Sequence, residues 1–278
     1  MLTRFAPSPT GHLHLGHLVN AVAVWTLARR ADGRVRLRIE DHDRERARPE
    51  YEQSILDDLE WLGLQPDTPS IAAFRAGPCE GRQSDHPDRY EAALAMLHAS
   101  GATYACACSR REILDRGAIP DRDGELRYDG HCRHRALPFA PGHGTRAVIE
   151  PGLEVFDDAI VGRQGQDPAR QCGDVLVRDR LGNWTYQFAV TVDDFVDEIT
   201  DVIRGQDLLA STGRQIRLAR MLGRQTPARF HHHPLIIGPD GEKLSKSRGA
   251  DGLRELRHAG VTPAEAIARA TELAGWSP

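Results

Sequence analysis

The chain has 278 residues, of which 40% are hydrophobic, and its 36 lysines and arginines face 40 acidic residues, a formal net charge of -4 at pH 7. This composition is typical of a soluble globular protein, and the acidic total argues against a dedicated basic nucleic-acid-binding module, although a basic face can coexist with it. Because the sequence shows no secretory signal and no apolar stretch of about 18 residues, we expect a cytoplasmic protein with no membrane partner.

The first hundred residues alternate between strand and helix patterns. Short strands are predicted at 2–6 and 35–39, and apolar residues recur at helical spacing over 15–30. A second helix follows Pro49, and a third is predicted at 87–99. Strand, helix, strand, helix is the opening of a doubly wound α/β sheet of the Rossmann type, in which ligands bind at the carboxyl ends of the strands.

Residues 104–173 interrupt this alternation. They are rich in Arg, His, Gly and Pro and carry four of the five cysteines, so we predict an insertion rather than a continuing sheet. Regular α/β patterning returns from about residue 174. The elements predicted there are strands at 175–177 and 187–192, a helix at 211–222, and a last helix that begins at the capping box of 262–265 and ends at Gly275.

A phosphate site is predicted in APSPTGHLHLGH, residues 6–17, where a strand end, a turn and a helix N-terminus follow one another. The unpaired N–H groups and the dipole of such a helix end favour an anion. His14 and His17, three residues apart, would project from the first helical turn and stabilise charge that builds on a phosphate. Two alternatives remain open at this point, a metal pair that includes His12 and surface histidines at a helix start.

The only two lysines of the chain, Lys243 and Lys246, both lie in GEKLSKSRG, residues 241–249. A compact ammonium on a flexible stem can follow phosphate oxygens as they move from ATP into pyrophosphate, whereas a guanidinium prefers a fixed planar fork. The stretch therefore predicts a second phosphate-binding element. The alternative is an exposed loop after the turn at 238–241.

Together, HLGH and KLSKS resemble the two signatures of class I aminoacyl-tRNA synthetases, with Leu in place of the usual Ile and Met. Further blocks resemble the glutamyl branch of these ligases. They are RFAPSPTG (4–11), LRIEDHD (37–43), YQFAVTVDD (186–194), VIRGQDL (202–208), STGRQIRLARMLG (211–223) and PLIIGPDGEKLSKS (234–247). The resemblance implies a Rossmann-type catalytic domain that binds ATP with Mg²⁺ through His14, Gly16, His17 and Lys246, with Lys243 also catalytic.

The same resemblance implies a site for L-glutamate. Arg4 and Arg204 could each fork onto a carboxylate, and Glu40 could hold the ammonium. Ser8 and Tyr186 could add hydrogen bonds, and Ala6 would line the site. The residues that the resemblance implies for glutamate are Arg4, Ala6, Ser8, Glu40, Tyr186 and Arg204. For any one charged residue of this set, the alternative is an ordinary surface ion pair.

The cysteines predict a metal site. Five cysteines, an odd number, argue against a disulfide framework. One residue separates Cys106 from Cys108, and Cys132 lies 24 residues after Cys108. Three thiolates fit one structural Zn²⁺ better than a catalytic zinc, which keeps an open position. Chemistry alone nominates His131 or His134 as the fourth ligand, and buried free cysteines are the alternative.

The resemblance implies a different fourth ligand, because the glutamyl-type pattern Cys-x-Cys followed by Tyr-x-x-x-Cys maps onto Tyr128. We expect Cys79 and Cys172 to be buried free cysteines. The three histidines at 231–233 invite a metal interpretation too. We instead expect them to form a solvated or nucleotide-facing loop ahead of a strand at 234–237.

Only 31 residues follow Ser247, whereas a conventional glutamyl-tRNA synthetase continues into an anticodon-binding region. The chain thus resembles the glutamyl-Q tRNA(Asp) synthetase family, which implies activation of glutamate without tRNA and its transfer to queuosine in the anticodon of tRNA(Asp). Three alternatives are a truncated glutamyl-tRNA synthetase charging a tRNA 3' end, an adenylate-forming enzyme of the same fold acting on a small acid, and a non-catalytic RNA-binding paralogue.

We expect a monomer with four parts. They are the first half of the catalytic domain (1–103), a zinc-binding, acceptor-type insertion (104–173), the second half of the catalytic domain (174–230), and the KLSKS loop with C-terminal helices (231–278).

Overall fold

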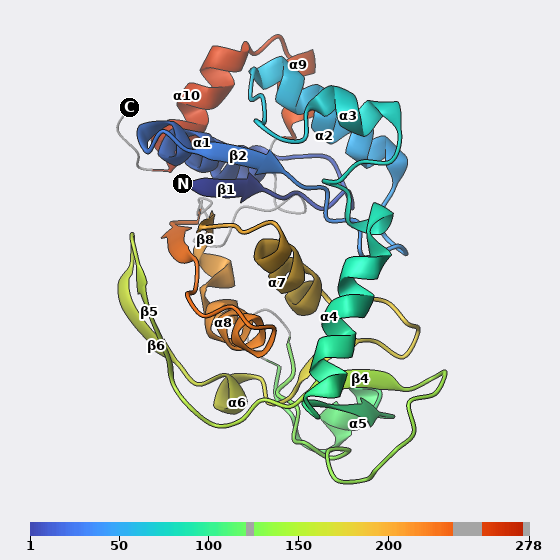
Figure 1. Cartoon of the computed structure of the whole chain (residues 1–278). Helices are drawn as coiled ribbons and strands as arrows, with labels where there is room; N and C mark the ends of the chain where they lie inside the picture. The colour runs from blue at the N-terminus through green and yellow to red at the C-terminus, as the bar shows by residue number, and fades with distance from the viewer. Residues whose placement is uncertain (121–124, 236–251, 275–278) are drawn as a thin grey trace.

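The computed structural model describes residues 1–120, 125–235 and 252–274 (Figure 1). The fold begins with β1 (Leu2–Phe5) and β2 (Arg34–Leu37), which pair in parallel with Leu2 opposite Arg34. Helix α1 (Leu15–Arg30) connects them and buries the apolar stripe expected from its spacing. The opening strand, helix, strand prediction is therefore confirmed.

A second set of strands continues this layer. Its order is β6-β5-β9-β8, in which β5 and β8 each run parallel to β9. The strands are β5 (Glu154–Asp158), β6 (Gly162–Gln166), β8 (Asp201–Gly205) and β9 (Arg229–His233). The Thr200 N–H, just before β8, donates to the Leu2 carbonyl at 2.9 Å, so β8 lies beside β1. The doubly wound α/β prediction is confirmed, and the carboxyl ends of β1 and β8 meet.

Helices cover this layer on both sides (Figure 1). The helices of the N- and C-terminal parts share one apolar core with β1 and β2. They are α2 (Pro49–Leu62), α3 (Ile71–Ala76), α9 (Leu253–His258) and α10 (Pro263–Leu273). Helix α4 (Pro87–Ala99) instead packs against α7 (Tyr186–Val196). The capping box predicted for the last helix is present, because Thr262 Oγ1 accepts from the Glu265 N–H. Gly275, expected to end that helix, lies outside the described residues.

The middle of the chain forms a separate antiparallel sheet. Its strands are β3 (Thr103–Cys106), β4 (Gly144–Ala147) and β7 (Val175–Arg178), accompanied by α5 (Arg110–Asp115) and α6 (Pro168–Gln171). We expected β7 to mark the return of the parallel sheet, but it pairs with β4 instead. The sheet of the insertion therefore continues past residue 173.

One predicted strand is wrong. Residues 187–192 belong to α7 (Tyr186–Val196), which packs against α8 (Thr212–Met221) and α4. The run is apolar with no visible period because the described side chains from Gln187 to Asp194 are all buried. A short, fully buried helix and a fully buried strand have the same apolar pattern, so periodicity does not separate them.

The histidines at 231–233 are not a loop. They form the end of β9, with the side chains of His232 and His233 buried, and the strand expected at 234–237 lies partly outside the described residues. The buried imidazoles of His232 and His233 each have hydrogen-bond partners, which a buried polar group requires.

Candidate active site

An open cleft of about 430 Å³ lies where β1 ends and α1 begins. The predicted residues Ala6 and Ser8 line it from the loop between these elements, and Glu40 and Tyr186 line it from after β2 and from the start of α7. Three segments distant in sequence thus meet at the carboxyl edge of the parallel strands, where ligands bind in this fold class.

His14 and His17 form the start of α1. His14 is the N-cap residue, and its Nδ1 accepts from the Gly16 N–H at 3.0 Å. His17 Nδ1 accepts from the backbone N–H of His14 at 3.1 Å, and the two ring centroids lie 3.9 Å apart. Because both Nδ1 atoms are acceptors, a neutral ring at either position carries its proton on Nε2 as a donor. A Cβ at Gly16 would lie 2.9 Å from His14 Cε1, so a larger residue at this position would displace the His14 ring.

The two lysines, Lys243 and Lys246, lie outside the described residues, but the segments that flank them are described. Before them, His233 Nε2 lies 3.1 Å from Asn20 Oδ1 on α1. After them, Gly252 forms a β-bridge with His14, and the Leu253 N–H donates to the Leu13 carbonyl at 3.0 Å. Both flanks of the lysine-bearing segment are therefore attached to the start of the helix that carries HLGH.

A buried charge network lies beneath the cleft. Arg4 Nε donates to Asp194 at 3.1 Å, and Arg38 Nη1 donates to the same carboxylate at 2.8 Å. Arg38 also donates to Glu40 at 3.0 Å through Nη2. Burial alone would raise the pKa of Asp194, but Arg4 and Arg38 hold it below its ordinary value. Arg4 thus already has an acidic partner, and Glu40 is held in place by Arg38.

Arg204 is different, because its described hydrogen-bond partners are all neutral. Arg204 is 3% exposed, and its guanidinium donates to His232 Nε2 at 3.0 Å, Gln215 Oε1 at 2.6 Å and Thr212 Oγ1 at 2.9 Å. Burial lowers the pKa of Arg204. A buried cation without an acidic partner is costly, and an incoming anion would relieve that cost.

Tyr186 lies among these charges. Burial and the Glu40 carboxylate raise the pKa of its phenol to about 12, while Arg204 and Arg4 oppose that shift. The Tyr186 hydroxyl is therefore a neutral donor near neutral pH. The four buried or lining side chains predicted for glutamate, Arg4, Glu40, Tyr186 and Arg204, converge in this structure.

Sequence reasoning missed Arg38, Asp194 and His232. A signal existed for the first two. Arg38 alternates with the buried Leu37 and Ile39, and two aspartates follow the apolar run QFAVTV, so the charges had to find partners in the interior.

The three predicted cysteine ligands come together at the end of β3. The sulfur atoms of Cys106, Cys108 and Cys132 all lie within 4.8 Å of one another, and the Cys108 and Cys132 sulfurs are 3.5 Å apart. Sulfurs around a tetrahedral zinc lie roughly 3.8 Å apart, given Zn–S bonds of about 2.3 Å. The sulfur separations are therefore compatible with a bound zinc ion.

The phenol of Tyr128 faces the same cluster. Its oxygen lies 3.4 Å from Cys106 Sγ and 3.6 Å from Cys108 Sγ, whereas His131 and His134 are exposed and are not part of the sulfur group. The position of the Tyr128 phenol thus agrees with the fourth ligand that the resemblance implies, whereas neither histidine lies beside the sulfur atoms. Arg146 stacks on the phenol ring at 3.6 Å and donates to Cys106 Sγ at 3.3 Å, which favours negative charge on the cluster.

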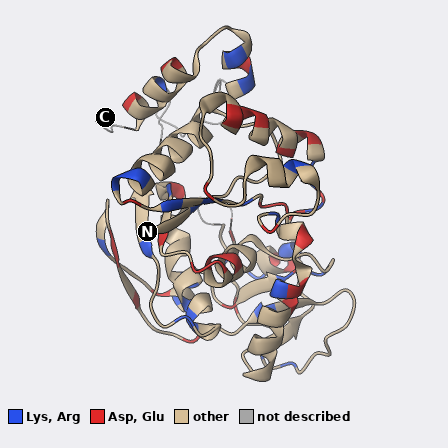
Figure 2. Cartoon of the chain, turned by 45° about the horizontal axis from the view of Figure 1, so that its top comes forward, with Lys and Arg blue, Asp and Glu red and all other residues tan. Residues whose placement is uncertain are grey.

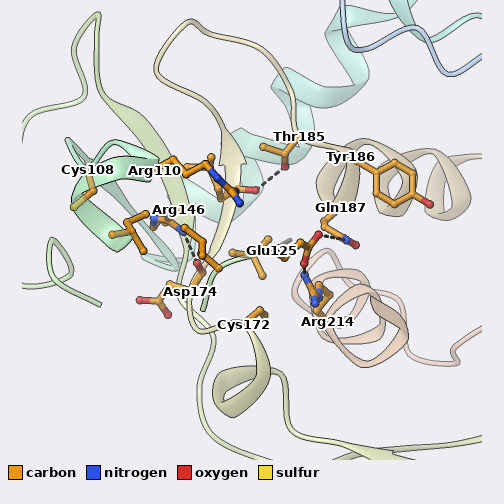
Figure 3. A pocket seen from close by; sticks show the side chains of 14 residues that line it. Cys108, Arg110, Glu125, Arg146, Cys172, Asp174, Thr185, Tyr186, Gln187 and Arg214 are labelled. Atoms are coloured by element: carbon orange, nitrogen blue, oxygen red, sulfur yellow. Dashed lines mark hydrogen bonds and ion pairs between the residues drawn. The ribbon is translucent and has the colours of Figure 1, made fainter. Parts of the chain in front are cut away.

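A second pocket, of about 300 Å³, lies between this cluster and α7 (Figure 3). Cys108 and Arg146 line one end, and Tyr186 lines the other, so the pocket adjoins the cleft at Tyr186. Glu125 contacts Arg214 of α8 and accepts from Gln187 Nε2 at 3.1 Å. The pocket is therefore lined by charged side chains and by the neutral amide of Gln187.

Basic and acidic residues are interspersed over both halves of the chain (Figure 2). Within the described ranges, no helix is long and apolar enough to cross a bilayer.

Known proteins resemble this chain over most of its length. Residues 1–278 match the family model described as tRNA synthetases class I (E and Q), catalytic domain. The chain is 44% identical over 256 residues to the glutamyl-Q tRNA(Asp) synthetase of Ralstonia nicotianae. The alignment covers 89% of this chain and 77% of that protein. It is 41% identical over 283 residues to the glutamyl-Q tRNA(Asp) synthetase of Symbiobacterium thermophilum, with 98% of this chain and 86% of that protein covered.

Among solved structures, the glutamate-tRNA synthetase from Elizabethkingia anophelis matches with a TM-score of 0.76 and 28% identity over 92% of this chain. The chain spans 58% of the length of that synthetase.

Proposed function

Because the chain belongs to the class I tRNA synthetases of the E and Q type, in the glutamyl-Q tRNA(Asp) synthetase family, we propose that it activates L-glutamate with ATP and transfers it to queuosine in the anticodon of tRNA(Asp). The observation that supports the first step best is the buried Arg204, a cation whose described hydrogen-bond partners are neutral, near the Tyr186 phenol, which the Glu40 carboxylate also faces. An amino acid presents the complementary charges, a carboxylate for Arg204 and an ammonium for Glu40.

In this proposal Arg204 binds one substrate carboxylate, and Arg4 contributes positive field from beneath the cleft. Tyr186 donates a hydrogen bond, while Ala6 and Ser8 form the wall of the site. A side chain that ends in a carboxylate is the feature that distinguishes glutamate from glutamine, and a buried, unneutralised guanidinium discriminates for it.

The α-carboxylate of glutamate attacks the α-phosphate of ATP, forming the mixed anhydride and releasing pyrophosphate. His14 and His17 donate through Nε2 to the phosphates as charge develops, and Gly16 allows the backbone to approach them. Lys243 and Lys246, outside the described residues, neutralise the departing pyrophosphate. Mg²⁺ bound to the ATP phosphates would supply further charge stabilisation.

In the second step a hydroxyl of the acceptor attacks the anhydride carbonyl, an ester forms, AMP leaves and the hydroxyl proton is released. We place the acceptor nucleoside in the second pocket, because that pocket adjoins the cleft at Tyr186 (Figure 3). The cysteine cluster with Tyr128 would hold one structural Zn²⁺, which stabilises the insertion beside this pocket.

The test is glutamate-dependent exchange of labelled pyrophosphate into ATP with no RNA present, followed by transfer of labelled glutamate to tRNA(Asp) with and without queuosine. We expect exchange without RNA and transfer only to the queuosine-containing tRNA. Exchange that requires tRNA, with label at a tRNA 3' end, would instead support the truncated glutamyl-tRNA synthetase. No exchange under either condition would overturn the enzymatic proposal.

A further inference from the structure

The guanidinium of Arg204 is held in a defined orientation by neutral groups. A guanidinium has five N–H donors, and Arg204 uses one on each of its three nitrogens, towards His232, Gln215 and Thr212. One further N–H remains on each terminal nitrogen. Two such donors on adjacent nitrogens are what a carboxylate needs for a bidentate pair. The partners of Arg204 therefore fix its plane and leave one N–H on each terminal nitrogen without a use in these three hydrogen bonds.

His232 can accept from Arg204 because of its other ring nitrogen. His232 is fully buried, and its Nδ1 lies 2.6 Å from Asp158 Oδ2. A carboxylate is an acceptor, so Nδ1 carries the proton and Nε2 presents its lone pair to Arg204 Nε. Burial and the neighbouring Arg204 also lower the pKa of His232 to about 4, so the imidazole is neutral near pH 7.

Asp158 is itself held rigidly. Its Oδ1 accepts from the Ile160 and Val161 N–H groups, each at 2.9 Å, and its carboxylate accepts from the backbone N–H of His232 at 3.2 Å. It lies at the end of β5, paired with Phe230 on β9. Three adjacent strands, β5, β9 and β8, thus carry the acid, the imidazole and the arginine in order.

The neutral imidazole between acid and arginine has an electrostatic consequence. Arg4 touches Asp194 directly and is neutralised by it. Arg204 is instead one imidazole removed from Asp158, so it is oriented by the carboxylate without direct contact. An aspartate in direct contact with Arg204 would compete with an incoming carboxylate for the same donors.

We propose that Asp158 and His232 are positioning residues that orient Arg204 for bidentate binding of a glutamate carboxylate while leaving its charge unneutralised. This inference rests on the proposed function, in which Arg204 binds that carboxylate. Removing the outer hydrogen-bond partners of metal ligands typically lowers metal affinity or activity about 10- to 100-fold, and we expect an effect of that size for the partners of Arg204.

The test measures KM for glutamate and for ATP, together with kcat, in pyrophosphate exchange without RNA. His232→Asn keeps a polar group near Asp158 but presents no acceptor to Arg204, so KM for glutamate should rise about 10- to 100-fold with KM for ATP unchanged. His232→Gln, whose amide oxygen reaches the position of Nε2, should recover much of that loss. The matched control is His231→Asn. His231 neighbours His232 on β9, pairs with Asp201 of β8 at 3.0 Å and makes no described side-chain contact with Arg204.

Asp158→Asn provides a second variant of nearly identical shape, for use if His232→Asn does not fold. An amide can also donate to Nδ1, which allows the imidazole tautomer whose Nε2–H opposes Arg204 Nε–H. We expect a selective rise in KM for glutamate of about tenfold. A glutamate KM unchanged in this variant, or shifted equally by His231→Asn, overturns the inference. Absence of exchange in the wild-type protein would instead count against the proposed function.

Discussion

The substitution Arg204→Met should weaken glutamate binding strongly while changing the free energy of unfolding little. The substitution removes two donors to a substrate carboxylate, each worth about 1.5–3 kcal/mol for a charged pair, so glutamate binding should weaken by about 3–6 kcal/mol, or roughly 10²- to 10⁴-fold. Stability should change little. Three hydrogen bonds of about 1 kcal/mol each are lost, but the several kcal/mol needed to bury a guanidinium without an acidic partner are recovered.

Arg4→Met is the matched comparison, since Arg4 is an equally buried arginine one strand away. It leaves Asp194 with Arg38 as its remaining close cation and gives the network an unbalanced negative charge, which should cost about 3 kcal/mol of unfolding free energy. The assays are urea unfolding and the glutamate KM in pyrophosphate exchange. The reasoning fails if Arg204→Met loses as much stability as Arg4→Met, or if it keeps the wild-type KM.

Three further predictions concern other parts of the chain. Lys246→Ala should lose pyrophosphate exchange while glutamate binding, measured by calorimetry, stays nearly intact; equal losses in both would remove its assigned role. Cys106→Ser should lower zinc content, measured by atomic absorption, and the melting temperature, because a structural site contributes to folding; a zinc-free protein of full stability would contradict this. Burial raises the pKa of Asp58 from 3.8 to about 7, so the native state binds this proton more tightly than the unfolded state and stability falls as pH rises through that interval. Asp58→Asn should therefore stabilise the protein by about 4 kcal/mol at pH 8 and by little at pH 4 in urea unfolding, and a gain that is independent of pH would refute the assignment.

Local sequence patterns were sufficient for the features that depend on near neighbours. Helix α1 follows from apolar spacing, its N-terminus from HLGH, and the last helix from the Thr262 capping box. The cysteine spacing predicted the three thiols that gather at the end of β3. In each case the interactions join residues close in the chain, or residue types whose chemistry admits few roles, so composition and spacing carry the information.

Other features depend on burial and on partners about 30 to 190 residues away. The sequence shows Arg4 and Arg204 as equivalent arginines, yet the fold pairs one with Asp194 and surrounds the other with neutral groups. The histidines at 231–233 suggested a solvated loop, yet Asp158, 74 residues from His232, accommodates that ring inside a sheet. Whether a charge is neutralised, and whether an imidazole is buried, is set by which strands become neighbours, and residue spacing along the chain does not contain that information.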